Sequence, residues 1–188
     1  VNITSVGGGL WIRLNDAVTN LDGLANLKSV AGYLRIWDNG SLTNIDGLSN
    51  ITTVEGNLDF SGNDALTNID GLSNITSVGD RLMITNADAL TNLDGLANLK
   101  SVGGSLLIWH NGFLTNCQGI APVLGWPNGP PDDAVGDSIS LISNGFGCNS
   151  VDEILASVVS EPTKPSITST ASEDGRITLR VSVSDNGG

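Results

Sequence analysis

Several residue types that build enzyme and metal centres are scarce in this sequence. Its 188 residues include one histidine, one tyrosine, one methionine and two cysteines. Lysine and arginine total 8 against 20 aspartates and glutamates, which gives a formal net charge of -12. An acidic chain repels nucleic acid phosphates and anionic membranes, and no apolar run is long enough to span a bilayer. We therefore expect neither nucleic acid binding nor membrane insertion.

The single histidine, His110, has no catalytic partners around it in the sequence. Neither a Ser–His–Asp set, nor a zinc-ligand spacing, nor a phosphate-binding loop accompanies it. A histidine on the surface is the simpler interpretation. The sequence therefore predicts a protein that is not an enzyme, with no catalytic residues and no cofactor.

What the sequence does contain is a repeat of 24 residues. The tripeptide Leu-Thr-Asn recurs with that step from Leu42 to Leu114, within units such as LTNIDGLSNITSV, which starts at Leu66. An alternating apolar stretch, such as the one from Leu34 to Ile36, follows each unit and is typical of a strand with one face inward. Asn, Gly and Asp punctuate every unit, and the helix period is absent.

The apolar positions of the repeat form columns that a single unit could not bury. Stacked units would place these columns in one continuous core, with strands in parallel at about 4.8 Å per turn. The predicted fold is therefore mostly β, a right-handed parallel β-solenoid. The columns are Val18, Leu42, Leu66, Leu90 and Leu114; Leu21, Ile45, Ile69, Leu93 and Cys117; Leu24, Leu48, Leu72, Leu96 and Ile120; Val6, Val30, Val54, Val78 and Val102; Leu10, Leu34, Leu58, Leu82 and Leu106; and Ile12, Ile36, Phe60, Ile84 and Ile108.

One polar column is also predicted to face inward. It holds Asn15, Asn39, Asn63 and Asn111 and is interrupted by Ala87. An inward asparagine at the end of a strand can satisfy backbone groups that a tight corner leaves unpaired. We therefore assign this column a structural role.

The pattern G-x-L-x-I-x-x-N-x-x-L-x-x-L-x-x-L, which runs from Gly32 to Leu48, resembles the receptor L domain of the insulin and epidermal growth factor receptors. It is more similar still to bacterial surface proteins that carry this repeat. Asn39 and Leu42 are separated by two residues, where the usual leucine-rich repeat has one, which favours the L-domain coil over a horseshoe with outer helices. The resemblance covers roughly residues 1–160 and implies a fold; because family members bind different ligands, it names none.

The repeat degrades after Gln118, where an insertion rich in Pro and Gly at 125–133 interrupts it. Residues 138–145 restore the strand pattern, and a short helix is predicted from Val151 to Val159. Ser150 and Glu153 form the capping box of that helix. A helix here would cover the open end of the core, as terminal units of solenoids must.

Both cysteines lie at this end of the array. Cys117 replaces an inward Leu or Ile, which predicts a Cys117–Cys148 disulfide, with two buried free thiols as the alternative. An isolated cysteine pair, few lysines and an acidic balance fit an exported protein. Since the chain begins at Val1 inside a repeat unit, we expect a mature or excised fragment of a secreted or cell-surface protein.

The composition changes at residue 161. Residues 161–188 hold a Pro-bearing linker and two alternating stretches, which resemble the first strands of a fibronectin type III domain. We therefore expect two parts, a solenoid with its cap at 1–160 and a truncated second domain at 161–188. Two strands are marginal alone in water, so the truncated strands would be loose or would self-associate with another sheet edge.

Two regular polar columns are further candidates. Stacked carboxylates, one per coil, could bind calcium. Each of these aspartates precedes a glycine in a turn, however, where its side chain can accept local backbone N–H bonds, so turn capping is favoured and no metal site is predicted. A threonine row is similar to an ice-binding face, although that row is single. The columns are Asp22, Asp46, Asp70 and Asp94, and Thr19, Thr43, Thr67, Thr91 and Thr115.

The positions that differ from unit to unit lie between the inward residues of each strand. Large aromatic and arginine residues on a solvent face are typical of binding hot spots, and tryptophan can also stack on sugars. The favoured function is recognition of a protein or carbohydrate ligand through this face. The alternatives are a rigid spacer without a ligand and a patch that a neighbouring domain or a second copy covers. The predicted ligand-binding residues are Trp11, Arg13, Tyr33, Arg35, Trp37, Asp59, Met83 and Trp109, with Arg81 beside them.

Overall fold

The computed structural model describes residues 2–127 and 134–159, and the backbone of residues 166–171 and 177–182. The predicted β-solenoid with a 24-residue period is confirmed: in the register of the strands, Leu10 pairs with Leu34, Leu34 with Leu58 and Leu58 with Leu82. Each residue therefore lies beside its equivalent in the next unit, and we call one such unit a coil. Parallel pairing of this kind needs the long connection that the rest of each coil supplies.

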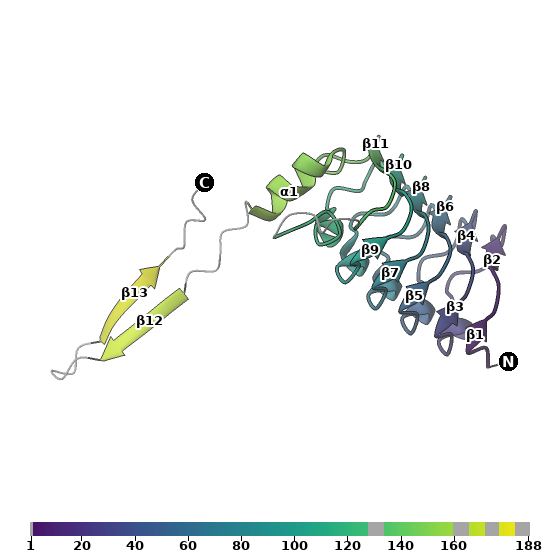
Figure 1. Cartoon of the computed structure of the whole chain (residues 1–188), viewed down its shortest axis with the longest axis horizontal. Helices are drawn as coiled ribbons and strands as arrows, with labels where there is room; N and C mark the ends of the chain where they lie inside the picture. Colours follow the sequence, from purple (N-terminus) through teal and green to yellow (C-terminus); the bar gives the residue numbers. More distant parts are fainter. Residues whose placement is uncertain (1, 128–133, 160–165, 172–176, 183–188) are drawn as a thin grey trace.

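Two parallel sheets run along the solenoid (Figure 1). The larger has the order β11-β10-β8-β6-β4-β2, and the smaller has the order β1-β3-β5-β7-β9. Short 3-10 helices stack on a third side and contact one another from coil to coil. The larger sheet consists of β2 (Leu10–Arg13), β4 (Leu34–Trp37), β6 (Leu58–Ser61), β8 (Leu82–Thr85), β10 (Leu106–Trp109) and β11 (Ile139–Ile142); the smaller of β1 (Ser5–Val6), β3 (Ser29–Val30), β5 (Thr53–Val54), β7 (Ser77–Val78) and β9 (Ser101–Val102); and the 3-10 helices are η1 (Asp22–Leu24), η2 (Asp46–Leu48), η3 (Asp70–Leu72), η4 (Asp94–Leu96) and η5 (Gln118–Ile120).

The apolar columns form one core inside this coil, as predicted. From the second coil onward their side chains are almost completely buried, and each large one contributes about 1.5–3 kcal/mol through burial. Members in the first coil, such as Leu10 and Ile12, are half-buried because they have a neighbouring coil on one side only. The prediction missed one inward column, at the corner before the smaller sheet: Leu27, Ile51, Ile75, Leu99 and Val123.

The buried asparagine column is confirmed. The side-chain amide of Asn63 donates to the Ile36 carbonyl of the preceding coil at 2.8 Å, and its Oδ1 accepts the backbone N–H of Asn39 at 3.2 Å. Asn39, Asn63 and Asn111 are completely buried, whereas Asn15, in the first described coil, is exposed, contrary to the prediction. Each side chain therefore satisfies backbone groups of the coil before it, which would otherwise remain unpaired in the core.

The glycine after each column aspartate brings successive coils into close contact. A Cβ on Gly71 would overlap the carbonyl oxygen of Ile45, one coil earlier. The same overlap faces Gly47, Gly95 and Gly119, whereas Gly23 has nothing within 4 Å of the corresponding position. Stacking of coils, rather than the turn itself, therefore requires glycine here.

The corner that follows each strand of the larger sheet has a left-handed backbone in every coil. The residues there have φ between 51° and 63°, and they are Leu14, Asp38, Gly62, Asn86, His110 and Ser143. Only one of the six is glycine, although side chains disfavour this conformation by about 1–2 kcal/mol. His110 is therefore a corner residue, and it is exposed.

The carboxyl end of the solenoid closes as predicted. Strand β11 pairs with β10 in the register Leu106↔Ile139, so this coil is longer than the others but its strand keeps its place in the sheet. Helix α1 (Val151–Val159) packs Ile154 into the core and contacts η5 (Figure 1). The predicted Cys117–Cys148 disulfide is present.

The helix cap differs from the prediction in one detail. Ser150 Oγ accepts the backbone N–H of Glu153 at 3.1 Å, as a capping box requires. The Glu153 carboxylate, however, accepts the N–H of Asn149 at 3.0 Å rather than that of Ser150. The return bond is therefore made one residue further from the helix.

The carboxyl-terminal part contains an antiparallel pair, β12 (Ser166–Ala171) and β13 (Ile177–Ser182), in the register Ser166↔Ser182. These strands coincide with the two alternating stretches predicted there. The Pro-bearing linker predicted before these strands lies outside the described residues. No helix in the described part of the chain is long and apolar enough to cross a membrane.

Candidate binding face

The variable strand positions line the outer face of the larger sheet in two rows. Trp11, Arg35, Asp59 and Met83 pair in register in one row, and Arg13, Trp37, Ser61, Thr85 and Trp109 pair in the other. Because neighbouring strands are about 4.8 Å apart, Trp109 lies three strands, or about 14 Å, from Trp37. Its indole N–H donates to Ser140 of β11 at 3.0 Å. Trp109 is thus separate from the other predicted aromatic residues, although Met83 lies on the neighbouring strand.

Five of the predicted residues form a compact group, which we call the aromatic–arginine cluster: Trp11, Arg13, Tyr33, Arg35 and Trp37. The Trp11 ring lies 5.4 Å from Tyr33 and 6.3 Å from Trp37, between ring centroids. The Arg35 guanidinium lies 4.9 Å from the Tyr33 ring and 5.1 Å from the Trp37 ring, and Arg13 lies 5.3 Å from Trp11. Cation–π attraction therefore holds the arginines against the rings.

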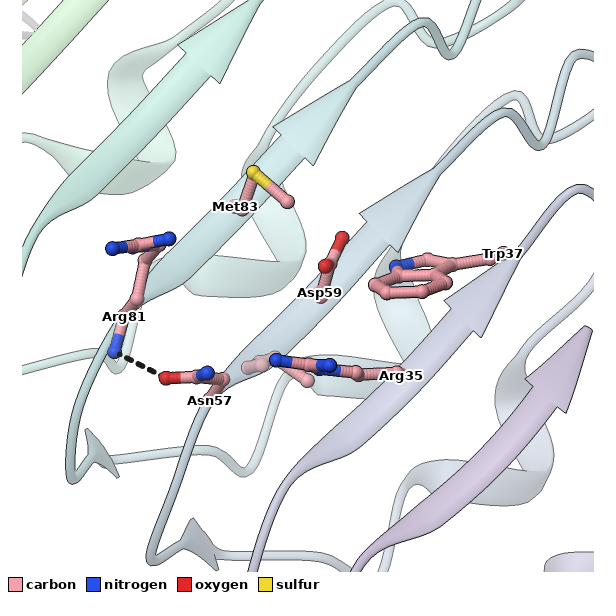
Figure 2. Close-up of a pocket in the computed structure, with 7 residues that line it drawn as sticks. Arg35, Trp37, Asn57, Asp59, Arg81 and Met83 are labelled. Atoms are coloured by element: carbon pink, nitrogen blue, oxygen red, sulfur yellow. Dashed lines mark hydrogen bonds between the residues drawn. The ribbon is translucent and has the colours of Figure 1, made fainter.

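A pocket of about 230 Å³ adjoins the cluster. Arg35 extends from β4 toward Asn57 at the start of β6, while Arg81 stands at the start of β8 (Figure 2). The backbone N–H of Arg81 donates to the Asn57 side chain at 3.2 Å, which joins the two strands at the pocket edge. Trp37, Leu58, Asp59 and Met83 complete the lining.

Asp59 lies at the bottom of this outer surface, and its exposure corrects the prediction. It was expected on the solvent face, but only 3% of it is exposed, because the pocket residues surround it. Burial raises the pKa of its carboxyl above the ordinary 3.8. The hydrogen bond from Ser61, the Trp37 indole and the charges of Arg35 and Arg81 oppose that shift.

A short chain of hydroxyl groups supports Asp59. Thr85 donates to the Ser61 hydroxyl at 3.0 Å, and Ser61 donates to the Asp59 carboxylate at 2.6 Å. Ser61 and Thr85 come from neighbouring strands, β6 and β8, so the chain crosses the sheet. It fixes the carboxylate in the pocket that the two arginines also line.

Two nitrogen donors beside Asp59 have no hydrogen-bond acceptor in the structure. They are Nε of Arg35 and the indole Nε1 of Trp37, and both atoms are buried. The Trp37 nitrogen faces Asp59 (Figure 2), so it stabilises the carboxylate electrostatically without meeting the geometry of a hydrogen bond. Buried donors without acceptors are costly, and no other buried side-chain nitrogen or oxygen among the described residues lacks a partner.

The positive charge of the solenoid is concentrated here. Within residues 2–127 and 134–159, the basic residues are Arg13, Lys28, Arg35, Arg81 and Lys100. All three arginines lie on the outer face of the larger sheet or at its edge, in a chain whose net charge is -12. The face therefore opposes the acidic character of the rest of the chain.

The aspartate column is not a set of turn caps, which corrects the prediction. In each turn the cap is the asparagine two residues earlier: Asn44 Oδ1 accepts the backbone N–H of Asp46 at 2.6 Å, and the same bond recurs at Asp22, Asp70 and Asp94. The asparagine side chain thus caps the first turn of each 3-10 helix. The side chains of the four aspartates are exposed to solvent. Among the described residues no group of three or more His, Cys, Asp or Glu side chains is placed to hold a metal ion.

The threonine row is exposed along the solenoid. Two of its hydroxyls are already engaged, because Thr43 donates to the Thr19 carbonyl at 3.1 Å and Thr91 to that of Thr67 at 3.3 Å. These bonds link neighbouring coils. These threonines therefore help to hold neighbouring coils together.

Sequence reasoning missed two features of the surface. Asn57 belongs to the same column as Tyr33 and Arg81, and that shared position could have placed it at the pocket. Phe113 and Phe146 occupy equivalent positions after Asn111 and Asn144 and are 70% and 92% exposed. Their signal in the sequence was a pair of phenylalanines where earlier coils have Ala or Ser.

Comparison with known proteins gives one family match. The family model of the receptor L domain matches residues 50–114, less than half of the chain. This segment contains Asn57, Asp59, Arg81 and Met83 of the pocket, and it ends before the cap. Neither the curated proteins nor the solved structures give a match.

Proposed function

We propose that this chain is a non-enzymatic recognition module of an exported or cell-surface protein, and that it binds a protein or glycan through the outer face of its larger sheet. The observation that carries the proposal is the aromatic–arginine cluster. The cluster interrupts a repeat whose other positions hardly change from coil to coil. Tryptophan, tyrosine and arginine are the residue types most enriched at binding hot spots.

Other features support this proposal. Receptor L domains are ligand-binding modules of receptors, and the match at residues 50–114 contains five of the seven residues that line the pocket. The Cys117–Cys148 disulfide fits an oxidising compartment. We further propose that residues 161–188 begin a fibronectin type III domain, so that the solenoid is one module of a longer protein.

The experiment is a binding screen with two kinds of probe, a random-peptide display library and a glycan array. Trp11 is 47% exposed at the edge of the cluster, so Trp11→Ala removes a large contact without opening the core. Hot-spot truncations cost at least about 2 kcal/mol, so we expect the variant to lose most of its captured ligand. Phe146→Ala is the matched control, because it removes a fully accessible aromatic ring from outside the face.

The alternative is a rigid spacer with no ligand of its own. It predicts that neither the library nor the array yields a ligand for the intact chain. Equal loss of capture in Trp11→Ala and Phe146→Ala would also contradict the proposal, because binding would then not depend on the sheet face.

A further inference from the structure

The charged residues that line the pocket do not balance one another. They are Arg35, Arg81 and the buried Asp59, and the positive charges of both arginines act on the Asp59 carboxylate. The carboxylate already accepts a hydrogen bond from Ser61. One positive charge is therefore left for a group from outside the chain.

Both arginines are held in place before any partner binds. The stacking of Arg35 between Tyr33 and Trp37 limits its rotamers, which lowers the entropy that binding would remove. Arg81 is exposed, and the bond of its backbone N–H to Asn57 fixes its strand beside the pocket. Planar guanidinium groups bind carboxylates through two parallel N–H···O bonds.

The size of the pocket points to a side chain rather than a whole ligand. Its volume of about 230 Å³ is below the ~300–1,000 Å³ of pockets that enclose drug-sized molecules. A single side chain of a larger partner would fill it. The rest of that partner would then lie over the aromatic–arginine cluster.

The aromatic ring that borders the pocket is poorly placed to stack on a sugar. Stacking needs an open ring face, but Arg35 and Trp11 lie against the Trp37 ring. Beside the pocket the cluster therefore offers guanidinium groups and ring edges to a partner, while Trp11, 47% exposed, adds an accessible apolar surface. These groups match the side chains and backbone of a protein surface.

We propose that the pocket between Arg35 and Arg81 receives a carboxylate side chain from an acidic segment of a partner protein. This inference rests on the binding face proposed above. Arg35 and Arg81 hold the carboxylate, Asn57 supplies a neutral hydrogen-bonding group at the rim, and Met83 packs against the aliphatic part of the incoming side chain. The Asp59 carboxylate, held by Ser61, lies in the same pocket as the two arginines.

The test uses nuclear magnetic resonance on the full chain labelled with ¹⁵N. The probes are a blocked Gly-Glu-Glu-Gly peptide, the same peptide with Gln in place of Glu, and an oligogalacturonate. We expect the glutamate peptide to shift the signals of the Trp37 indole N–H and the Arg35 Nε–H in a saturable way. The glutamine peptide should shift them at least about tenfold less at equal concentration, because it lacks the charge that strengthens each hydrogen bond.

Variants assign the effect to the pocket. Arg81→Gln should weaken binding of the glutamate peptide at least about tenfold, and Arg81→Lys should restore part of it, since lysine keeps the charge but not the planar fork. Lys100→Gln is the control, because it makes the same change of charge away from the larger sheet. It should leave the affinity unchanged.

Three results would overturn the proposal: equal binding of both peptides, unchanged binding by Arg81→Gln, or tighter binding of the galacturonate than of the glutamate peptide. The outcome is separable from that of the proposed function. A chain that captures library peptides in a Trp11-dependent but Arg81-independent way would refute the carboxylate pocket alone. A chain whose face captures no ligand would refute both.

Discussion

Gly71→Ala tests whether close stacking of coils is what the repeated glycine provides. The added methyl group would overlap the Ile45 carbonyl oxygen, which belongs to backbone and cannot rotate away. Gly23→Ala is the matched control, since it makes the same change in the same Asp-Gly-Leu turn with nothing within 4 Å. Neither glycine has a positive φ, so the turn itself accepts alanine at both positions.

The two variants should differ in sign. Overpacking in a tight interior costs about 1–3 kcal/mol, and a collision with backbone places Gly71→Ala near the upper end. For a chain of this size each kcal/mol lowers the Tm by about 2–4 °C, so the expected decrease is about 6–12 °C. Gly23→Ala restricts the unfolded chain without strain in the folded one and should gain up to about 1 kcal/mol.

Thermal and urea unfolding followed by circular dichroism would measure both effects. Urea is informative because a change of midpoint at constant slope reports stability alone. Equal Tm values for the two variants, or a stable Gly71→Ala, would show that the coils can separate enough to admit a methyl group. The explanation of the glycine column by stacking would then be wrong.

Three further outcomes are expected. Asn63→Ala removes the partners of buried backbone groups in the preceding coil, and each unsatisfied group costs about 1–3 kcal/mol, so the urea midpoint should fall clearly. Reduction of the Cys117–Cys148 disulfide, which closes a separation of 31 residues, should cost about 3–4 kcal/mol, measurable by unfolding with and without dithiothreitol; an unchanged midpoint would refute this. Burial raises the folded pKa of Asp59 above 3.8, so the folded chain binds the proton more tightly and stability falls as pH rises through that range. The urea midpoint of Asp59→Asn should therefore rise relative to that of the unmodified chain as the pH increases from 3 to 7. A difference between the two midpoints that stays constant over this range would contradict the raised pKa of Asp59.

Most of the fold could be predicted because the length of the repeat determines which residues pair between neighbouring strands. A step of 24 residues places Leu34, Leu58 and Leu82 in one column, and only stacking can bury such a column. The column from Leu27 to Val123 was missed, since it lies at a corner where no strand alternation marks it. The cap could be predicted because Cys117 and the Ser150 capping box are local signals.

The remainder depended on three-dimensional contacts. The Asp46 turn was assigned the wrong capping group, because Asn44 and Asp46 have the same capping chemistry and only geometry decides which oxygen reaches the N–H. The left-handed corner could not be seen, since Leu14 and His110 hold that conformation without a preference for it. Asp59 was placed on the correct side of the sheet. Its burial, however, depends on Arg35 and Trp37 from the neighbouring strand β4, and that contact cannot be read from the sequence.

The contact between Gly71 and Ile45 has a consequence for how such a protein can change. In each stacked pair of coils the same backbone carbonyl of one coil contacts the same glycine of the following coil. The contact between coils is therefore identical wherever it occurs. Duplication, deletion or exchange of a whole 24-residue segment therefore creates no new kind of joint inside the core. The outer sheet residues travel with their segment, and new combinations of them can be assembled by recombination rather than by point mutation alone.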